Sequence, residues 1–382
     1  MKLIKKFAAT ALVLTFIVIA ALPSFTEGQQ PFDVDAKSAV LMEAETGTVL
    51  YSKNADEALP PASVTKVMTL LLVMEAVDSG ALSLDEEISV SEYASSMGGS
   101  QVFLEPGEKM TAGELIKCVS VASANDAAVA LAERVCGSEE AFVNRMNERA
   151  AELGLKNTRF ENVTGLDDDV TDHVTSAFDI AVMSRELMRH EKIFDYTTLW
   201  TDTIRNGAFG LTNTNRLIRF YSGATGLKTG STSKAKFCIS ATAKRDGMHL
   251  IAVIMGAESR DVRNEAAKKL LDWGFATYAL YRSDGGTVCE IPVRGGKMEK
   301  VDAVCPSLSF ITAKASAGGI TRELQVEGSV KAPVKKGDPV GTANYFSGGK
   351  IIFSQTVTAA EDVGRKGFSD VWAGLLKALL LR

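Results

Sequence analysis

The order of apolar patterns along the chain constrains its fold more than any other feature. Apolar stretches at residues 38–42 and 49–52 flank the turn residues 45–47 and predict a β-hairpin. Helical spacing follows, and apolar stretches at 237–243 and 250–255, joined by a polar turn, return to a strand pattern. Strands at both ends of a helical block predict an α+β fold, in which helices pack on an antiparallel sheet.

The helical block begins where Pro60 and Pro61 break the chain. From Ser63 onward, apolar residues recur at three- and four-residue steps around most of the helix, which is typical of a buried helix. The other helical patterns cover residues 112–119, 126–135, 139–153, 176–189 and, after the second pair of strands, 262–278.

The composition changes after about residue 281, where short runs rich in Val and Ile alternate with Gly and Pro. Pairs such as Gly295-Gly296 mark turns between these runs, which predicts a small all-β domain. A chain of 382 residues has room for two domains of ordinary size. We therefore expect one domain over residues 28–280 and an all-β domain over residues 281–362.

Both termini carry segments outside these domains. Residues 1–27 run from a basic stretch through an apolar run to polar residues, the order of a secretory signal peptide; an uncleaved membrane anchor is the alternative. Residues 363–382 place Phe368, Trp372 and several leucines on one face of an amphipathic helix, which is too short to span a bilayer but suits its interface. The alternative is a helix docked on the protein's own core. We expect a secreted protein, peripherally attached to the outer face of the cytoplasmic membrane.

Charge and metal-binding patterns exclude several classes of function. A formal net charge of −5 gives the chain no electrostatic attraction to nucleic acid. The three histidines form no H-x-x-x-H pair and the cysteines no C-x-x-C pair, so we expect no metal site, redox motif or cofactor. The cysteines are expected to be small buried side chains, with a Cys289–Cys305 bridge as the alternative.

One serine stands in a setting that suits nucleophilic catalysis. Ser63 and Lys66 are three residues apart on the expected helix, so the lysine amine can reach the serine hydroxyl. Lysine can serve as the base of a serine nucleophile when burial or a second cation keeps it neutral. The pattern S-x-x-K occurs at four serines, and what distinguishes Ser63 is the proline break before it and the buried helix after it.

Two further motifs follow in order. Ser123-Ala124-Asn125 precedes a helical stretch, and Lys228-Thr229-Gly230 precedes the strand pattern at 237–243. Each motif alone is more simply explained as a cap or a turn. With Ser63 and Lys66 they form an ordered set, S-x-x-K, S-x-N and K-T-G, that chance rarely produces.

This set resembles the signature of penicillin-binding proteins, and the stretches PPASVTK, SANDAA and GLKTG are similar to the low-molecular-weight D-alanyl-D-alanine carboxypeptidases. The resemblance covers about Asp35 to Trp273, and the β domain and terminal helix fit the same family. It implies a β-lactamase/transpeptidase-like domain that removes the terminal D-alanine from peptidoglycan stem peptides through an acyl-enzyme. It also implies inhibition by penicillin and other β-lactam antibiotics.

The resemblance implies a role for each motif residue. The catalytic residues would be Ser63 as nucleophile, Lys66 as its base and Ser123 as a proton relay. The substrate would be held by a second set, in which the asparagine orients the amide and the lysine and threonine bind the terminal carboxylate: Asn125, Lys228, Thr229, Gly230 and Ser231. Backbone N–H groups of Ser63 and Ser231 would form the oxyanion hole, and Lys228 would help to keep Lys66 neutral.

Other interpretations use the same residues. A β-lactamase or esterase would share the fold, but Ala124 departs from S-D-N, and no glutamate between residues 162 and 175 is placed as a deacylation base. The acids of that loop, Asp167 among them, are expected to be solvated. Arg216 either adds charge to the carboxylate site or is an ordinary surface arginine. A catalytically silent wall-binding module would lack a motif residue, and the key residues of all three motifs are present.

Overall fold

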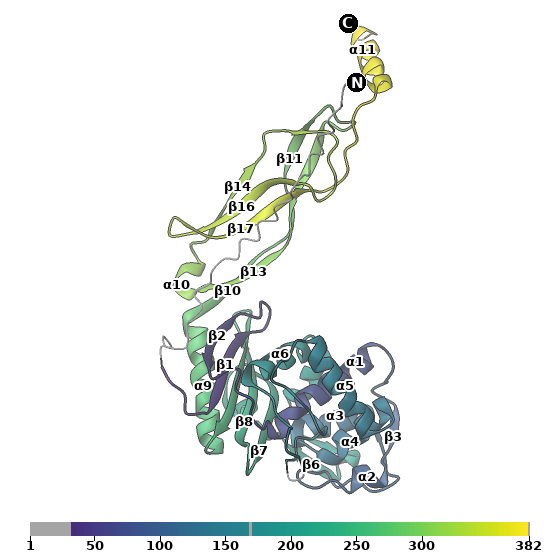
Figure 1. Ribbon diagram of the computed structural model, residues 1–382, viewed down its shortest axis with the longest axis vertical. Coiled ribbons are helices and arrows are strands. Elements are labelled where there is room, and N and C mark those ends of the chain that lie inside the picture. Colours follow the sequence, from purple (N-terminus) through teal and green to yellow (C-terminus); the bar gives the residue numbers. More distant parts are fainter. Residues whose placement is uncertain (1–31, 168–169, 381–382) are drawn as a thin grey trace, which may run out of the picture. The chain divides into compact units, whose positions relative to one another are not determined.

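The computed structural model describes residues 32–167 and 170–380, which divide into two compact units. The large unit holds residues 32–281 and Ser309–Ala315, and the small unit holds Arg282–Leu308 and residues 316–380 (Figure 1). The segment Ser309–Ala315 falls inside the β domain expected from sequence, yet it belongs to the large unit, where Ile311 joins the apolar core. The expected signal peptide, residues 1–27, lies outside the described residues.

The large unit is built on a five-stranded antiparallel sheet in the order β2-β1-β9-β8-β7. The early hairpin and the late strand pair expected from sequence meet in this sheet, because β1 pairs with β9 along its whole length. Its strands are β1 Ser38–Glu43, β2 Val49–Lys53, β7 Ala224–Thr232, β8 Lys236–Arg245 and β9 Met248–Ala257. The edge strand β7 is not expected from the sequence, since its glycines and threonines give no apolar alternation.

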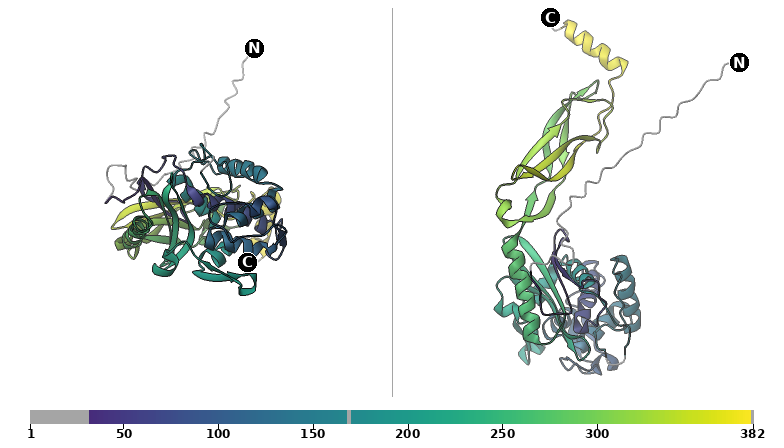
Figure 2. Two further views of the ribbon diagram at one scale, coloured as in Figure 1. Left: turned by 90° about the horizontal axis from the view of Figure 1, so that it is seen from below. Right: turned by 60° about the vertical axis from the view of Figure 1, so that its left-hand side comes forward.

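Both faces of this sheet are buried. Val40 and Met42 of β1 enter the core formed with the helices of residues 66–187, whereas Ala39 and Leu41 enter a second core with α9 (Arg260–Thr277). Figures 1 and 2 show α9 on one face of the sheet and the helices of residues 66–187 on the opposite face. Burial on both faces explains why the central strands are apolar throughout instead of alternating with polar residues.

The helices expected from sequence form close to their predicted bounds. They begin with caps where the sequence offers them, as at Ser138 and Ser176, whose hydroxyls accept backbone N–H groups of the first turn. The helices are α1 Lys66–Asp78, α2 Glu92–Ser95, α3 Ala112–Lys117, α4 Asn125–Cys136, α5 Glu139–Glu152, α6 Ala177–Leu187, α7 Phe194–Thr197 and α8 Leu217–Phe220. Two small two-stranded antiparallel sheets are added, β3 Glu87–Ser89 with β4 Lys109–Thr111, and β5 Thr201–Ile204 with β6 Phe209–Thr212.

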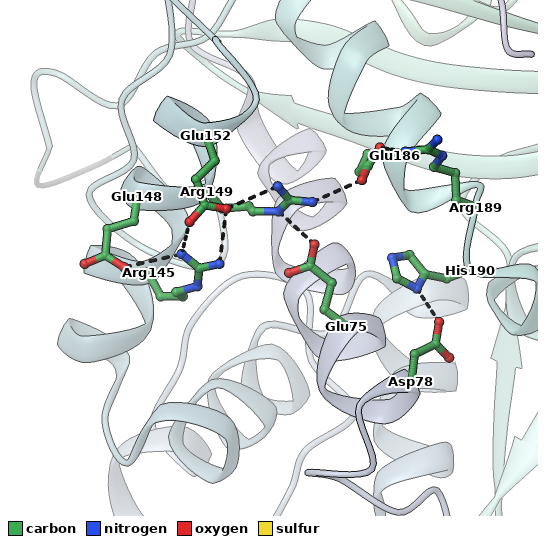
Figure 3. Close-up of polar contacts among 9 residues, drawn as sticks. All are labelled: Glu75, Asp78, Arg145, Glu148, Arg149, Glu152, Glu186, Arg189 and His190. Carbon is green, nitrogen blue, oxygen red and sulfur yellow. Dashed lines mark hydrogen bonds and ion pairs between the residues drawn. The ribbon is translucent and has the colours of Figure 1, made fainter. Parts of the chain in front are cut away.

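An ion-pair network joins α1, α5 and α6 (Figure 3). Arg149 of α5 lies at its centre and contacts Glu75 of α1 over 2.7 Å and Glu186 of α6 over 3.1 Å. The side chain of Arg149 is 17% exposed, so solvent screens these pairs less than it screens the outlying pair of Arg145 and Glu148. The network therefore fixes the positions of three helices that cover the sheet.

The small unit is mainly a six-stranded sheet in the order β14-β16-β17-β12-β11-β15, with β15 parallel to β11 and the other pairs antiparallel. Its strands are β11 Gly286–Arg294, β12 Lys300–Cys305, β14 Thr321–Val326, β15 Val330–Lys331, β16 Pro339–Ser347 and β17 Lys350–Ala359. Near the points in the sequence where the chain passes from one unit to the other, it forms β10 Tyr278–Ser283, β13 Leu308–Ala313 and the short α10 Lys314–Ala317. All five cysteines are free thiols, Cys289 and Cys305 included.

The last helix, α11 Phe368–Leu380, presents an apolar surface to solvent. Phe368 is 80% exposed, and Trp372, Leu376 and Leu379 are exposed as well. Among the described residues, no helix has both the length and the apolar character needed to cross a membrane.

Candidate active site

Ser63 lies in a strained turn that leads directly into α1. One turn of 3₁₀ helix, Ala62–Thr65, precedes the helix, and Ala62 has a φ of 50°, a region that non-glycine residues seldom adopt. Thr65 Oγ1 donates a hydrogen bond to the carbonyl of Ala62 over 2.8 Å. The turn that presents Ser63 is therefore held by side-chain contacts beneath it.

His173 supports this turn from the protein interior. Its Nδ1 accepts the N–H of Glu161 over 3.1 Å, so the ring proton is on Nε2, which donates to Thr65 Oγ1 over 2.8 Å. Burial lowers the pKa of His173 to about 4, and the ring stays neutral at physiological pH. His173 is thus a buried histidine that supports the Ser63 turn through the Thr65 side chain.

Lys66 reaches the Ser63 hydroxyl as the S-x-x-K spacing predicts. Its Nζ lies 3.0 Å from Ser63 Oγ, 2.6 Å from Asn125 Oδ1 and 2.9 Å from the carbonyl oxygen of Thr164. The side chain is completely buried. Burial above all, and then the positive charge of Lys228, hold the pKa of Lys66 well below its usual value, and Asp126 opposes this only in part.

The S-x-N motif occupies the junction of two helices. Cys118–Ala122 forms a π-helical turn, and Ser123 follows it with a left-handed φ of 63° before α4 begins. Irregular turns of this kind gather at functional sites, because they aim side chains that a regular helix would direct elsewhere. The result is that Asn125 faces Lys66, while its Nδ2 donates to the Gly98 carbonyl over 2.7 Å.

The K-T-G motif precedes the strand at 237–243, here β8, as predicted, and it also lies within a strand of its own, β7. Lys228 Nζ donates to Ser123 Oγ and to the Thr229 carbonyl, each over 2.8 Å. Lys228 is buried, and burial together with the charge of Arg263 lowers its pKa to about 7. Thr229 Oγ1 donates to Thr214 Oγ1 over 2.8 Å, so the strand is tied to the loop before α8.

Two glycines permit close approach to the Ser63 turn. A Cβ atom on Gly230 would lie 2.7 Å from the Ser63 nitrogen, and a Cβ on Gly165 would lie 1.9 Å from the Ala62 carbonyl oxygen. Neither contact is tolerable, so β7 and the loop at Gly165 can pack against the turn only with glycine there. The third residue of K-T-G thus places the backbone leading to Ser231 beside the N–H of Ser63.

The loop after residue 162 is built into the site, and the expectation of a solvated acidic loop is wrong for Asp167. Asp167 is buried, and its carboxylate accepts a hydrogen bond from Thr232 at the end of β7. Asn162 Oδ1 accepts the N–H groups of Thr164 and Gly165 and so shapes the turn that directs the Thr164 carbonyl at Lys66. Asp172 is exposed, as expected, and residues 168–169 lie outside the described residues.

The motif residues open into a cleft of about 660 Å³. Ser63, Ser123, Thr229, Gly230 and Ser231 line it, while Lys66, Asn125 and Lys228 are buried behind them. Arg216 lines the cleft together with two arginines that the sequence analysis missed, Arg260 and Arg263. Both lie in the first turn of α9, some 30 residues after K-T-G, and only the fold of β8 and β9 brings them back to the site.

The site contains the groups that acyl transfer needs, a serine hydroxyl beside a buried amine. In the part of the chain that the structure describes, no three His, Cys, Asp or Glu side chains gather as metal ligands would. The structure brings together all eight residues expected from the motifs, namely Ser63, Lys66, Ser123, Asn125, Lys228, Thr229, Gly230 and Ser231.

Comparison with known proteins agrees with the fold and the motifs. Residues 24–259 match the family described as D-alanyl-D-alanine carboxypeptidase, and residues 275–365 match the C-terminal domain of penicillin-binding protein 5. The chain is 42% identical over 376 residues to the D-alanyl-D-alanine carboxypeptidase DacF of Bacillus subtilis, covering 95% of this chain and 96% of the relative.

Solved structures of two penicillin-binding proteins have a fold similar to that of this chain. Penicillin-binding protein 5 of Haemophilus influenzae superposes with a TM-score of 0.78 at 30% identity, over 88% of this chain and all of that one. Penicillin-binding protein D2 of Listeria monocytogenes, in its ampicillin-bound form, superposes with a TM-score of 0.59 at 32% identity, over 64% of this chain.

Proposed function

The chain belongs to the D-alanyl-D-alanine carboxypeptidase family of low-molecular-weight penicillin-binding proteins, and on that basis we propose how its own residues carry out the reaction. It is a serine-type hydrolase of peptidoglycan stem peptides. The observation that carries the assignment of roles is the buried Lys66 amine, 3.0 Å from Ser63 Oγ and close to a second lysine.

Ser63 is the nucleophile and neutral Lys66 its general base. A neutral amine has two N–H bonds and one lone pair. Asn125 Oδ1 and the Thr164 carbonyl accept the two N–H groups, which leaves the lone pair directed at the Ser63 hydroxyl. Lys66 therefore takes the Ser63 proton as Oγ attacks the carbonyl carbon of the penultimate D-alanine.

The other motif residues bind the substrate and move protons. The N–H groups of Ser63 and Ser231 stabilise the oxyanion that forms as the amide is attacked. Ser123, whose hydroxyl accepts a hydrogen bond from Lys228, relays a proton to the departing amine. Thr229, with Arg216 and Arg263, binds the carboxylate of the terminal D-alanine. Asn125 orients the substrate amide, and water then hydrolyses the Ser63 ester.

Release of D-alanine from a synthetic stem pentapeptide tests these roles. Lys66→Arg keeps the positive charge but has no accessible neutral form, so D-alanine release is expected to fall by about 10²–10⁴-fold. Ser123→Ala is expected to lower the rate without preventing substrate binding. If Lys66→Arg retained wild-type activity while thermal unfolding showed an intact fold, Lys66 would not be the base.

We also propose an extracytoplasmic location with α11 lying on the membrane surface. The signal-like pattern of residues 1–27 and the exposed apolar side chains of α11 support this. A chain lacking residues 363–382 is expected to stay in the supernatant when sedimented with lipid vesicles, whereas the chain that retains them is expected to pellet. Equal sedimentation of both chains would contradict the role of α11.

A further inference from the structure

Arg205 lies in the turn between β5 and β6 and binds a neighbouring loop through its side chain. Its guanidinium forms a bidentate ion pair with the Glu108 carboxylate, over 2.7 and 3.0 Å. The same group donates to the carbonyl oxygens of Val102 and Phe103, over 2.9 and 3.0 Å. A planar guanidinium can make these four contacts at once, whereas the single ammonium of a lysine cannot. The arginine is therefore placed to fix the path of the loop at residues 102–103.

The backbone on both sides of this contact is strained. Arg205 has a φ of 53° and Phe103 a φ of 56°, in the left-handed region that residues with side chains seldom adopt. Burial of the Phe103 ring does not explain the conformation, because Phe103 is 67% exposed and packs edge-on against Phe209. Backbone in this region persists where surrounding contacts determine it, and such positions gather at functional sites. The hydrogen bonds of Arg205 are contacts of that kind.

A buried carboxylate holds the same loop from the protein interior. Asp126, in the first turn of α4, is completely buried and accepts the N–H groups of Val102 and Leu104, each over 3.1 Å. The N–H groups of the loop are thus bound to α4, and its carbonyl groups to the β5–β6 turn. Because both kinds of backbone group are occupied, the loop has a defined position relative to α4, the helix that begins at Asn125.

The beginning of the loop fixes the orientation of Asn125. The N–H of Asn125 donates to the Ser100 carbonyl over 2.7 Å, and its Nδ2 donates to the Gly98 carbonyl over 2.7 Å. These two bonds leave Oδ1 to accept from Lys66 Nζ, over 2.6 Å. Since Gly98 and Ser100 lie only a few positions before Val102, movement of the loop at residues 102–103 also moves the groups that orient Asn125.

The hairpin that carries Arg205 forms part of the cleft as well. From the turn, β6 leads to Thr212, and Thr212 and Asn213 line the cleft together with Ser100 of the loop. Arg205 joins these two segments, although Arg205 and Val102 are 103 positions apart in the sequence. Arg205 itself is not among the lining residues, so it connects two parts of the cleft wall from behind.

We propose that Arg205 is a positioning residue for the acylation of Ser63. It fixes residues 98–104, and through them it holds Asn125 where the amide oxygen aligns the Lys66 amine with the serine hydroxyl. Arg205 acts through this loop and not by contact with the substrate. The inference rests on the proposed function, because it concerns the same step, in which Lys66 takes the proton of Ser63.

Acylation of the whole chain by a fluorescent penicillin, followed over time at several concentrations, tests this role. The measurement separates the dissociation constant of the first complex from the acylation rate constant at saturating penicillin, and loss of stability alone leaves that rate constant unchanged. Arg205→Met is expected to lower the rate constant by about tenfold, since small misplacements of a catalytic group cost up to about 10²-fold. In an Asn125→Ala background the same change is expected to lower it by less than about twofold, because two residues that act through one contact are not additive.

Arg134→Met is the matched control. Arg134 of α4 also pairs through two nitrogens with a glutamate, Glu86, and donates to the Ala81 carbonyl over 3.2 Å, yet none of these three residues lines the cleft. The acylation rate constant of this variant is expected to match that of the wild type. Arg205→Lys keeps a charge beside Glu108 but cannot keep all four contacts, and its expected loss of about threefold provides the same comparison if Arg205→Met does not fold.

The outcomes separate this inference from the proposed function. A wild-type rate constant in both Arg205 variants would overturn the inference and leave the proposed function intact. An equal loss in Arg205→Met and Arg134→Met would do the same, as would a loss in Arg205→Met that is equally large with and without Asn125. A wild-type protein that intact penicillin does not acylate would overturn the proposed function itself.

Discussion

Lys228 Nζ donates a hydrogen bond to Ser123 Oγ over 2.8 Å, and this contact joins the edge strand of the sheet to the turn between the π-helical segment and α4. Both side chains are buried, and neither has a partner of opposite charge in this contact. The charge of Lys228 acts instead on Lys66, whose pKa it helps to lower. The charges of the two lysines are therefore coupled. The strand β7, which carries Lys228, helps to lower the pKa of Lys66.

This coupling predicts a shifted pH profile in Lys228→Gln. Neutral Lys66 is required for acylation, so the rate rises with pH through the lowered pKa of that amine. Removing the Lys228 charge removes a cause of the lowering, and the pKa of Lys66 rises. The acid limb of the acylation rate, measured with a fluorescent penicillin at several pH values, should move to higher pH. A limb that stays in place or moves to lower pH would contradict the coupling.

A methyl group at Gly230 should disrupt the site. The new Cβ of Gly230→Ala would lie 2.7 Å from the Ser63 nitrogen and 2.8 Å from that of Val64, so β7 must withdraw from the turn. Loss of an oxyanion donor costs about 10²–10³-fold in rate, and a loss near the lower figure is expected for acylation. Gly210→Ala, in a strand position with open space around it, is the control and should acylate normally. Similar rates for the two variants would argue against this packing.

The ion-pair network in Figure 3 predicts that its buried arginine contributes more to stability than its more exposed one. Arg149 is largely buried and contacts both Glu75 and Glu186, so Arg149→Met leaves Glu75 without its ion-pair partner and Glu186 with only the exposed Arg189. The expected loss is about 1–3 kcal/mol in the free energy of unfolding. Arg145→Met removes more exposed pairs and should cost less than about 1 kcal/mol. Urea unfolding measures both, and equal losses would show that burial does not set the difference.

His173 predicts loss of stability in acid. The unfolded histidine binds a proton below about pH 6.5, whereas the folded one, with a pKa of about 4, stays neutral. Acid therefore favours the unfolded state, and stability present above about pH 6.5 is lost as the pH falls toward 4, by roughly 3 kcal/mol at most. His173→Gln cannot titrate, so its stability should fall less steeply over this range. An unchanged slope would contradict the pKa of about 4.

Much of the fold and site is accessible from the sequence because the strongest signals are local. The apolar spacing after Ser63 predicts the helix α1, and the S-x-x-K interval predicts the contact between Ser63 and Lys66. The three motifs then identify the residues that meet at the cleft, although they lie more than 160 positions apart in the chain. The order of most strands and helices can be predicted as well, since those elements have their own apolar patterns.

What the sequence does not give depends on contacts between distant segments. β7 has no strand pattern of its own and is a strand because β8 pairs with it. Asp167 looks like one acid in a polar loop, yet Thr232 binds it from the end of β7. Arg260 and Arg263 carry no motif, and His173 reaches Thr65 across more than 100 residues. Each of these positions is set by the tertiary fold, which overrides local preference.

The most direct test of the account is mass spectrometry of the protein after incubation with benzylpenicillin, with Ser63→Ala in parallel. A stable penicilloyl adduct is expected on the peptide that contains Ser63, and no adduct is expected in the variant. A protein without adduct in the presence of intact penicillin would contradict Ser63 as the nucleophile. Hydrolysed penicillin without an adduct would instead indicate a β-lactamase on the same fold.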